Sequence, residues 1–448
     1  MADPQDARDA RQALGRSLSA LRQASGHTQT TLAGIVHYGR STIANVETGR
    51  QNVPRTFWLN CDDELRAGGA LVEEYDQLQD LLNAAQRRAA LGAANVTVSA
   101  MDSVVSSGSA SQLLGHGTKH ALGLESITEI AARLLSVKPY PAEAVLAVLE
   151  LGIADVVGRY EREGPTGLVH ELVVLRRLLD DLYRDEPPAR LRHRLLRAAG
   201  QACGLLAYVA VNLGRPANAD AYAVEGFALA HIASDTDLMA WVRGTQSFNA
   251  YYQGRFDLAL AFARDGLAHA LDGPQAIRLK VNGEARALAS IGGRAREALA
   301  AVDAAYSYGE RHEAPVGISP CISLGIYGWG RIVANAITVN QVLGRPQQVI
   351  TLIGKIGETV QASDSDWSRS LVGLDHATAL LQKPFCDVEQ AMAVATLATV
   401  SATDNPITSV IQRAHALVAA AAPWSQYSAV AEFRERMQGL THSRAAGR

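Results

Sequence analysis

The side chains best suited to chemistry in this 448-residue chain gather in one short segment, residues 40–48. A helix over this segment would bury Ile43 and Val46 on one face. Its other face would carry the polar residues Arg40, Ser41, Asn45 and Thr48. Side chains of these types can hydrogen-bond base edges when a helix lies in the major groove of DNA. The pattern therefore predicts a DNA recognition helix.

Two further helices are expected to hold this one in place. The first has an apolar stripe at positions i, i+4 and i+7, formed by Leu14, Leu18 and Leu21. Gly26 is suited to end it, and Thr28 is suited to cap the next helix. That second helix would bury Leu32, Ala33 and Val36. Gly39 and Gly49 mark the two ends of the third helix.

Residues 14–58 resemble the Cro/repressor-like helix-turn-helix family, in particular its actinobacterial members. The matching motifs are Leu14-Gly15-Arg16, Thr28-Gln29, Arg40-Ser41-Thr42-Ile43, Glu47-Thr48-Gly49-Arg50 and Pro54-Arg55-Thr56-Phe57-Trp58. The sequence departs from the family pattern at His37-Tyr38-Gly39, where relatives more often have Gly-Tyr-Ser.

The resemblance implies which residues would contact DNA. Gln29 would hydrogen-bond a phosphate and brace the recognition helix. Four side chains would face the major groove, namely Arg40, Ser41, Thr42 and Asn45. Arginine there favours bidentate contact with guanine, and asparagine favours adenine. Arg50 and Arg55 lie beyond the helix and would contact phosphates, which position a protein without reading sequence.

Charge is distributed unevenly along the N-terminal part of the chain. Residues 8–60 contain seven arginines against Asp9 and Glu47, a net charge of +5, whereas residues 61–80 have one arginine against seven acids. A chain of net charge −3 therefore contains a positive segment, as expected of a DNA-binding domain. The alternative, an arginine-rich surface that is only solvated, is disfavoured because the charge coincides with the helix pattern.

Composition favours an all-α, cytoplasmic protein. Apolar residues make up 48% of the chain and aromatic residues 6%, and alanine is abundant. Arginine supplies 37 of the 42 basic residues, which fits a high-GC genome. The cysteines stand singly and show no metal-ligand spacing: Cys61, Cys203, Cys321 and Cys386. The N-terminus is too polar for a signal peptide, and no apolar run is long enough to span a membrane. We expect no cofactor.

The chain is expected to have three parts. Residues 8–88 would form the helix-turn-helix domain with an acidic helical extension. Residues 89–123 are rich in glycine, alanine, serine and valine, and are predicted to be a flexible linker. Residues 124–440 have a helical pattern interrupted by glycine and proline, and would form a helical-repeat domain for dimerisation, effector binding or both.

A repeat is visible within the last part. Gly-Arg pairs recur at residues 214, 254, 293 and 344, each between two apolar helical segments. Small residues follow five and twelve positions after the first three glycines: Ala219, Ala259 and Ala298, then Gly226, Gly266 and Ala305. The spacing resembles the tetratricopeptide repeat and implies an α-solenoid. The units are longer than that repeat, and the fourth, with Val349 and Ile356, is degenerate like a terminal cap.

By the geometry of this repeat, the first helix of each hairpin would line a concave surface. Seven side chains are expected to face it: Gln201, Tyr208, Trp241, Phe248, Tyr251, Lys280 and Arg331. Aromatic rings beside two cations would suit a peptide and its carboxylate. Trp241 and Phe248 are seven residues apart, a spacing that is also typical of core packing, and the two cations equally suit plain surface.

No constellation predicts an enzyme. The glycine-rich segment 325–330 lacks a P-loop lysine, and His116 and His120 have no carboxylate nearby in sequence. The sequence instead predicts a homodimeric transcriptional regulator whose repeats sense a peptide, a small molecule or a protein partner. This combination resembles the peptide-sensing regulators of Gram-positive bacteria. The alternative is a protein-binding adaptor that its N-terminal domain recruits to DNA, which co-purification of one stoichiometric partner would favour.

Overall fold

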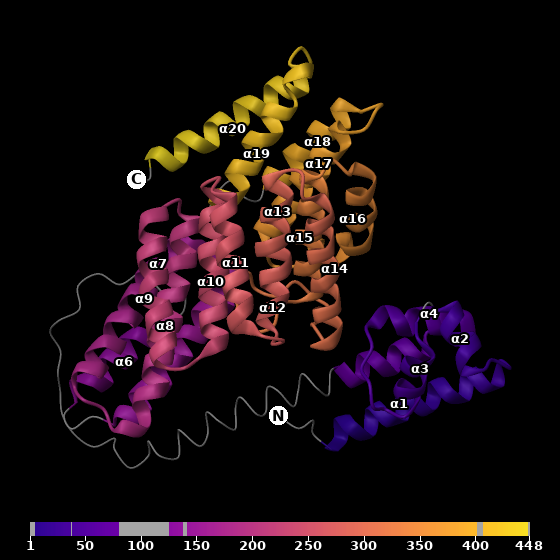
Figure 1. Cartoon of the computed structure of the whole chain (residues 1–448), viewed down its shortest axis with the longest axis horizontal. Helices are drawn as coiled ribbons and strands as arrows, with labels where there is room; N and C mark the ends of the chain where they lie inside the picture. Colours follow the sequence, from indigo (N-terminus) through magenta and orange to yellow (C-terminus); the bar gives the residue numbers. More distant parts are fainter. Residues whose placement is uncertain (1–4, 37, 80–124, 138–140, 401–405, 447–448) are drawn as a thin grey trace. The chain divides into compact units, whose positions relative to one another are not determined.

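The structure of this protein is a computed structural model. Its described residues form helices and no strand (Figure 1). They comprise residues 5–36, 38–79, 125–137, 141–400 and 406–446. The all-α fold class is therefore confirmed. The chain divides into two compact units, Met1–Thr118 and Lys119–Arg448. The predicted linker, the end of the predicted acidic extension, His37, His116 and His120 lie outside the described residues.

The described part of the first unit contains five helical segments. Four are α1 (Gln5–Ala24), α2 (Gln29–Ile35), α3 (Arg40–Glu47) and α4 (Arg55–Leu65), and residues 70–79 are also helical. The predicted end signals are confirmed. Gly26 and Gly49 adopt φ of 73° and 70° after α1 and α3, a conformation that glycine reaches without strain. Thr28 caps α2 by accepting a hydrogen bond from the Thr31 amide at 3.1 Å.

One apolar core holds the first unit together. Leu14 and Leu18 of the predicted α1 stripe are buried, and Leu21 is half-buried. The core continues into a group of aromatic rings from α4 and its neighbours: Tyr38, Phe57, Trp58 and Tyr75. Edge-to-face pairs of this kind add to the stabilisation that burial provides. The core of the helix-turn-helix segment is thus completed by α4 and the helix at residues 70–79.

The second unit consists of packed helices. They are α6 (Ile127–Ser136), α7 (Ala142–Arg184), α8 (Ala189–Asn212), α9 (Pro216–Ile232), α10 (Thr236–Tyr252), α11 (Phe256–Ala270), α12 (Gln275–Arg278), the π-helix η1 (Leu279–Ala285), α13 (Arg286–Ile291), α14 (Ala295–Arg311), α15 (Trp329–Val342), α16 (Pro346–Gln361), α17 (Asp366–Leu381), α18 (Val388–Val400), α19 (Thr408–Ala420), the 3-10 turn η2 (Ala422–Trp424) and α20 (Ser428–Ala446). None of the helices in the described part of the chain has both the length and the apolarity of a membrane span.

The long helix α7 is two antiparallel helices joined at Gly164. This glycine has φ 77° and ψ 173°, which interrupts the helix. A Cβ atom on Gly152 would lie 2.8 Å from Leu175 Cδ2, so the two halves pack closely against each other. An ion pair from Arg159 to Glu171 also joins the halves, with Nη2 and Oε2 2.5 Å apart.

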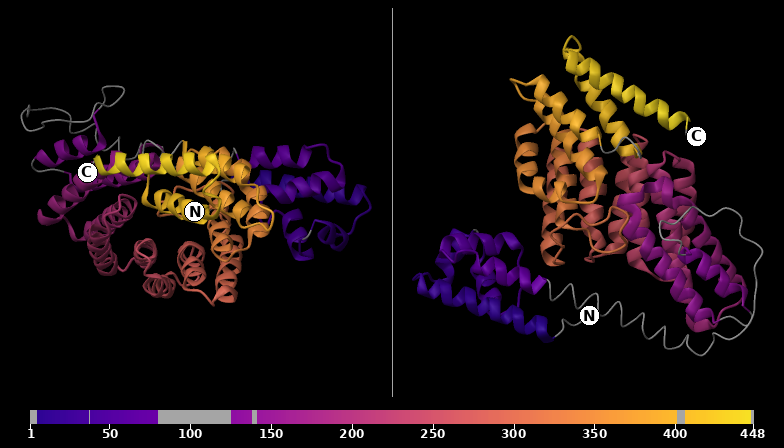
Figure 2. Two further views of the ribbon diagram at one scale, coloured as in Figure 1. Left: turned by 90° about the horizontal axis from the view of Figure 1, so that it is seen from above. Right: turned by 180° about the vertical axis from the view of Figure 1, so that it is seen from behind.

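The predicted glycine repeat corresponds to four helical hairpins. The four glycines have φ between 64° and 73° and join α8 to α9, α10 to α11, α13 to α14, and α15 to α16: Gly214, Gly254, Gly293 and Gly344. The small residues lie where helices meet. A Cβ atom on Gly226 would lie 3.2 Å from the Gly200 carbonyl oxygen of α8, and one on Gly266 would lie 2.7 Å from Leu279 Cδ2. The hairpins from α8 to α16 follow a curved row (Figure 2).

The loop at residues 312–328 crosses the inner side of this row. The Trp241 indole donates a hydrogen bond to the Ser323 carbonyl at 2.7 Å, and the Gln275 amide donates one to the Leu324 carbonyl at 2.9 Å. The glycines of segment 325–330 let the loop lie close to the start of α15, because a Cβ atom on Gly328 would lie 2.8 Å from the Gly317 carbonyl oxygen. The inner side is therefore occupied by the chain itself at this point.

Candidate nucleic-acid interface and central cavity

The polar face of α3 is exposed. Ile43 and Val46 anchor the helix in the core, with 0% and 2% of their surface exposed. Three of the four residues predicted to face the major groove are exposed, namely Arg40, Ser41 and Asn45, and Thr42 is partly buried. The helix is eight residues long, so its outward face offers only a few side chains to a ligand.

Glu47 at the end of α3 ties that helix to the two preceding ones. It accepts hydrogen bonds from Arg22 of α1 at 3.1 Å and from Gln29 of α2 at 2.9 Å. Burial opposes ionisation of Glu47, but the hydrogen bonds from Arg22 and Gln29 outweigh this effect, and the pKa of Glu47 is lowered. Gln29 thus braces α3 from within the protein, and its contact to a phosphate stays a prediction.

Gly15 lets α1 approach the end of α3. A Cβ atom at this position would contact the carbonyl oxygen of Val46 and would lie 2.7 Å from that of Glu47. Gly49 is confined as well, since a Cβ atom there would lie 2.9 Å from Gln12 Cγ. The orientation of the exposed α3 face therefore depends on two glycines outside that face.

Three arginines of this region, Arg40, Arg50 and Arg55, differ in their partners. Arg55 makes a two-point contact with Asp76, with Nε–Oδ1 and Nη2–Oδ2 distances of 2.9 Å and 2.8 Å. The hydrogen bond from Arg55 lowers the pKa of Asp76, so the pair is charged at neutral pH. Arg40 and Arg50 are exposed and have no carboxylate partner within the described segments. Sequence reasoning assigned Arg50 and Arg55 the same phosphate-contacting role, because the partner of Arg55 is 21 residues away.

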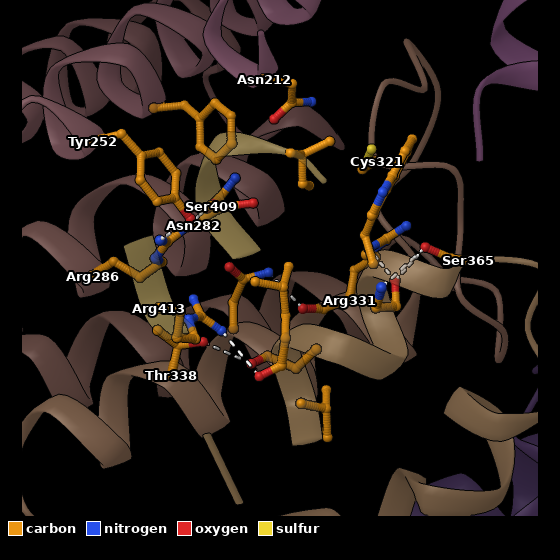
Figure 3. Close-up of a pocket in the computed structure, with 18 of the residues that line it drawn as sticks. Asn212, Tyr252, Asn282, Arg286, Cys321, Arg331, Thr338, Ser365, Ser409 and Arg413 are labelled. Carbon is orange, nitrogen blue, oxygen red and sulfur yellow. Dashed lines mark hydrogen bonds between the residues drawn. The ribbon is translucent and has the colours of Figure 1, made fainter. Parts of the chain in front are cut away.

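The second unit contains a partly open cavity of about 70 Å³ (Figure 3). Of the seven side chains predicted to face a groove, three line it, namely Tyr208, Phe248 and Arg331. The rings of Tyr208 and Phe248 are stacked with centroids 5.0 Å apart. The structure does not bring the other four into the lining: Gln201, Trp241, Tyr251 and Lys280.

Contacts within the protein explain where several of these residues lie. Trp241 is 1% exposed and is bound by the loop at residues 312–328, and Lys280 pairs with Glu284 at 2.6 Å. Arg331 binds Glu161 of α7, with Nη2 and Oε1 2.7 Å apart. The carboxylate that Arg331 contacts is therefore supplied by the chain itself.

Sequence reasoning missed two further arginines in the cavity wall. Arg286 is 4% exposed and donates to the Asn282 amide oxygen at 2.6 Å and to the Tyr252 hydroxyl at 2.9 Å. Arg413 of α19 donates to Asp375 at 2.9 Å. The available signal was an arginine on the first helix of a hairpin, where neighbouring positions are apolar.

A family model described as a helix-turn-helix domain matches residues 13–75. The match covers α2, α3 and α4, most of α1 and part of the helix at residues 70–79. The first unit thus contains a helix-turn-helix domain, which supports a DNA-binding regulator. No curated protein matches the chain.

Proposed function

We propose that this protein is a dimeric, sequence-specific transcriptional regulator whose second unit senses an effector. One observation carries the proposal: within a helix-turn-helix domain, α3 presents Arg40, Ser41 and Asn45 to solvent while its other face is anchored in the core. A short, rigidly held helix with an exposed polar face is what insertion into the major groove requires.

In the proposed complex, α3 lies in the major groove. Arg40 makes a bidentate contact with guanine and Asn45 contacts adenine, while Ser41 and Thr42 complete the groove-facing set. Arg50 contacts a phosphate, because it is exposed and has no carboxylate partner among the described residues. Arg55 contributes less, since Asp76 already neutralises its charge.

The short reading surface supports a dimer. A helix-turn-helix domain reads a few base pairs through three or four side chains, so two copies on two half-sites give the specificity that one lacks. In such dimers the half-sites are about 34–36 Å apart or a multiple of that distance. Affinity would then respond to any change in the second unit that alters the spacing of the two domains.

The cavity supports a small effector rather than an extended peptide. Its volume of about 70 Å³ is far below that of a peptide site, and the loop at residues 312–328 occupies the inner side of the hairpin row. Polar and aromatic side chains converge on this cavity, which is the usual character of a small-molecule site.

The test is selection of bound fragments from the source genome by the full-length protein, followed by sequencing. Wild type is expected to enrich fragments that share a two-part sequence with half-sites about one helical turn apart. An Arg40→Ala protein, compared in parallel, is expected to lose most of the enrichment. Recovery of random fragments by the wild type would overturn the proposal.

A further inference from the structure

The wall of the central cavity contains more positive than negative charge. Arg286, Arg331 and Arg413 line it, and the carboxylates of Glu161 and Asp375 bind the last two. Three guanidinium groups thus face two carboxylates. Among the arginines that line the cavity, Arg286 alone has no carboxylate partner within the described residues.

Within the described part of the chain, no carboxylate makes a hydrogen bond or an ion pair with Arg286. The amide oxygen of Asn282 and the hydroxyl of Tyr252 accept its hydrogen bonds, and the ring of Tyr251 lies 4.2 Å from its guanidinium carbon. Asp375 is near enough to interact electrostatically with Arg286. Its Oδ2 atom, however, accepts hydrogen bonds from Arg413 and Thr338. Burial lowers the pKa of Arg286, but its interactions with Tyr252 and Tyr251 outweigh this effect and keep it charged, so an anion that joins it gains a buried positive partner.

Arg286 also has an unused donor. Its Nε is buried and lacks a hydrogen-bond partner within the described part of the chain. The residue follows directly after the π-helix η1, which carries Asn282. Single turns of π-helix inside α-helices are frequent at functional sites, because they re-aim side chains. The unpaired donor therefore lies at the residue directly after the backbone irregularity.

Figure 3 shows how these groups are arranged. Arg286 lies on one side of the cavity with Tyr252, Asn282 and Ser409, and the neutralised Arg331 lies on the other side. A water molecule needs about 10–15 Å³ of cavity volume. A cavity of about 70 Å³ therefore admits roughly five to seven non-hydrogen atoms.

We propose that this cavity binds a small monocarboxylate, whose carboxylate group neutralises Arg286. A monoanion matches the single excess charge, whereas a phosphate monoester carries about −1.5 to −2 at neutral pH and would overcompensate it. The amide nitrogen of Asn282 is a second donor for the carboxylate, because only the amide oxygen is used by Arg286. The stacked rings of Tyr208 and Phe248 supply an apolar wall for a short carbon chain.

Such a ligand would join hairpins that are distant in sequence. The cavity walls come from α7, α8, α10, η1, α13, α15, α17 and α19, so an occupant contacts both ends of the curved row. Binding would stabilise one curvature of the second unit. The effect on DNA affinity rests on the proposed function, whereas binding of the carboxylate does not.

The test is thermal unfolding of the full-length protein, with calorimetric titration, against acetate, propionate, butyrate, pyruvate and lactate. At least one of them is expected to raise Tm in a saturable manner. Propionamide, which has the same shape as propionate without the charge, and inorganic phosphate are expected to have no such effect. Equal stabilisation by the amide or by phosphate overturns the proposal, as does the lack of response to all five carboxylates.

Three variants locate the site. Arg286→Gln is expected to weaken binding about tenfold to a hundredfold, because a charge-assisted hydrogen bond is lost. Arg243→Gln is the control, since Arg243 pairs with Asp265 and lies outside the cavity lining, and it is expected to bind normally. Ala334→Leu keeps every charge but fills the cavity, so it is expected to abolish binding even if Arg286→Gln fails to fold. Normal binding by a folded Ala334→Leu protein contradicts the assignment.

A last measurement separates the two proposals. The affinity of the full-length protein for its selected DNA is measured with and without the bound carboxylate, and a change is expected. Unchanged affinity, with binding of the carboxylate intact, contradicts the regulatory role and leaves the ligand site standing.

Discussion

At the scale of single residues, the partner that an arginine has within the protein determines whether it can also contact DNA. Arg40 and Arg55 have the same chemistry and belong to the same module, yet Asp76 holds only the second. The sequence motif could identify both as DNA-contacting candidates. It assigned Arg40 to a base and Arg55 to a phosphate, but it could not show that Asp76 pairs with Arg55, because an ion pair between helices depends on packing that local spacing does not specify.

Arg40→Ala is expected to weaken binding to the specific site by about 1–3 kcal/mol and to relax discrimination at one base pair. The physical reason is the loss of one bidentate contact to a base edge. Equilibrium binding to the selected site and to its single-base variants measures it. Arg55→Ala is the control and should cost less than Arg40→Ala. A larger loss for Arg55→Ala would show that the wrong arginine was assigned to the groove.

Glu47→Gln is expected to destabilise α3 in a pH-dependent manner. Because the pKa of Glu47 is lowered in the folded protein, its charge stabilises the fold above the ordinary glutamate pKa. That contribution is lost as the pH falls through the lowered value. At neutral pH, local opening of α3 should therefore require more free energy in the wild type than in the variant. This difference should vanish in acid. Amide hydrogen exchange of α3, corrected for intrinsic rates, measures it, and a difference that persists in acid would argue against the ionised brace.

At the scale of helices, the sequence predicted most of what local signals control. Gly26, Thr28 and Gly49 gave the ends of the first three helices, and the four Gly-Arg pairs located the hairpin turns. The reversal within α7 at Gly164 was not predicted, although the pair Gly164-Pro165 is a local signal for such a break. The path of the loop at residues 312–328 was not predicted either, because its carbonyl groups bind side chains on distant helices.

Gly15→Ala is expected to destabilise the first unit by about 1–3 kcal/mol, because the added methyl group meets backbone carbonyls of α3 that cannot move aside. DNA affinity should fall with it, since α3 is displaced. Gly34→Ala is the matched control. A Cβ atom there meets nothing within 4 Å, so this variant should keep or slightly gain stability. Thermal unfolding and DNA binding of both proteins test the role of helix approach, and equal behaviour of the two would refute it.

At the scale of the whole molecule, the second unit is closed by contacts between residues far apart in the chain. Glu161 binds Arg331, 170 residues later, and also accepts hydrogen bonds from Ser365 and from the Cys321 amide. The repeat spacing predicted the hairpins but not these contacts between distant residues. Glu161 and Arg331 both line the cavity of about 70 Å³.

Glu161→Gln is expected to destabilise the second unit by about 3–5 kcal/mol, because Arg331 is left buried without its counterion. The free energy of unfolding of the full-length protein measures the effect. Glu143→Gln, which breaks an exposed ion pair with Arg190, serves as the control and should leave stability unchanged. Similar free energies of unfolding for the two variants would mean that the stability of the second unit does not depend on the Glu161–Arg331 pair.

The central claim is that α3 reads DNA sequence. Its most direct test is the affinity of the full-length protein for its selected duplex, measured beside a scrambled duplex of equal composition at the same salt concentration. The account predicts a preference of at least about 10³-fold for the selected duplex, which Arg40→Ala reduces. Equal affinity for the two duplexes, or a preference that Arg40→Ala leaves intact, would contradict it.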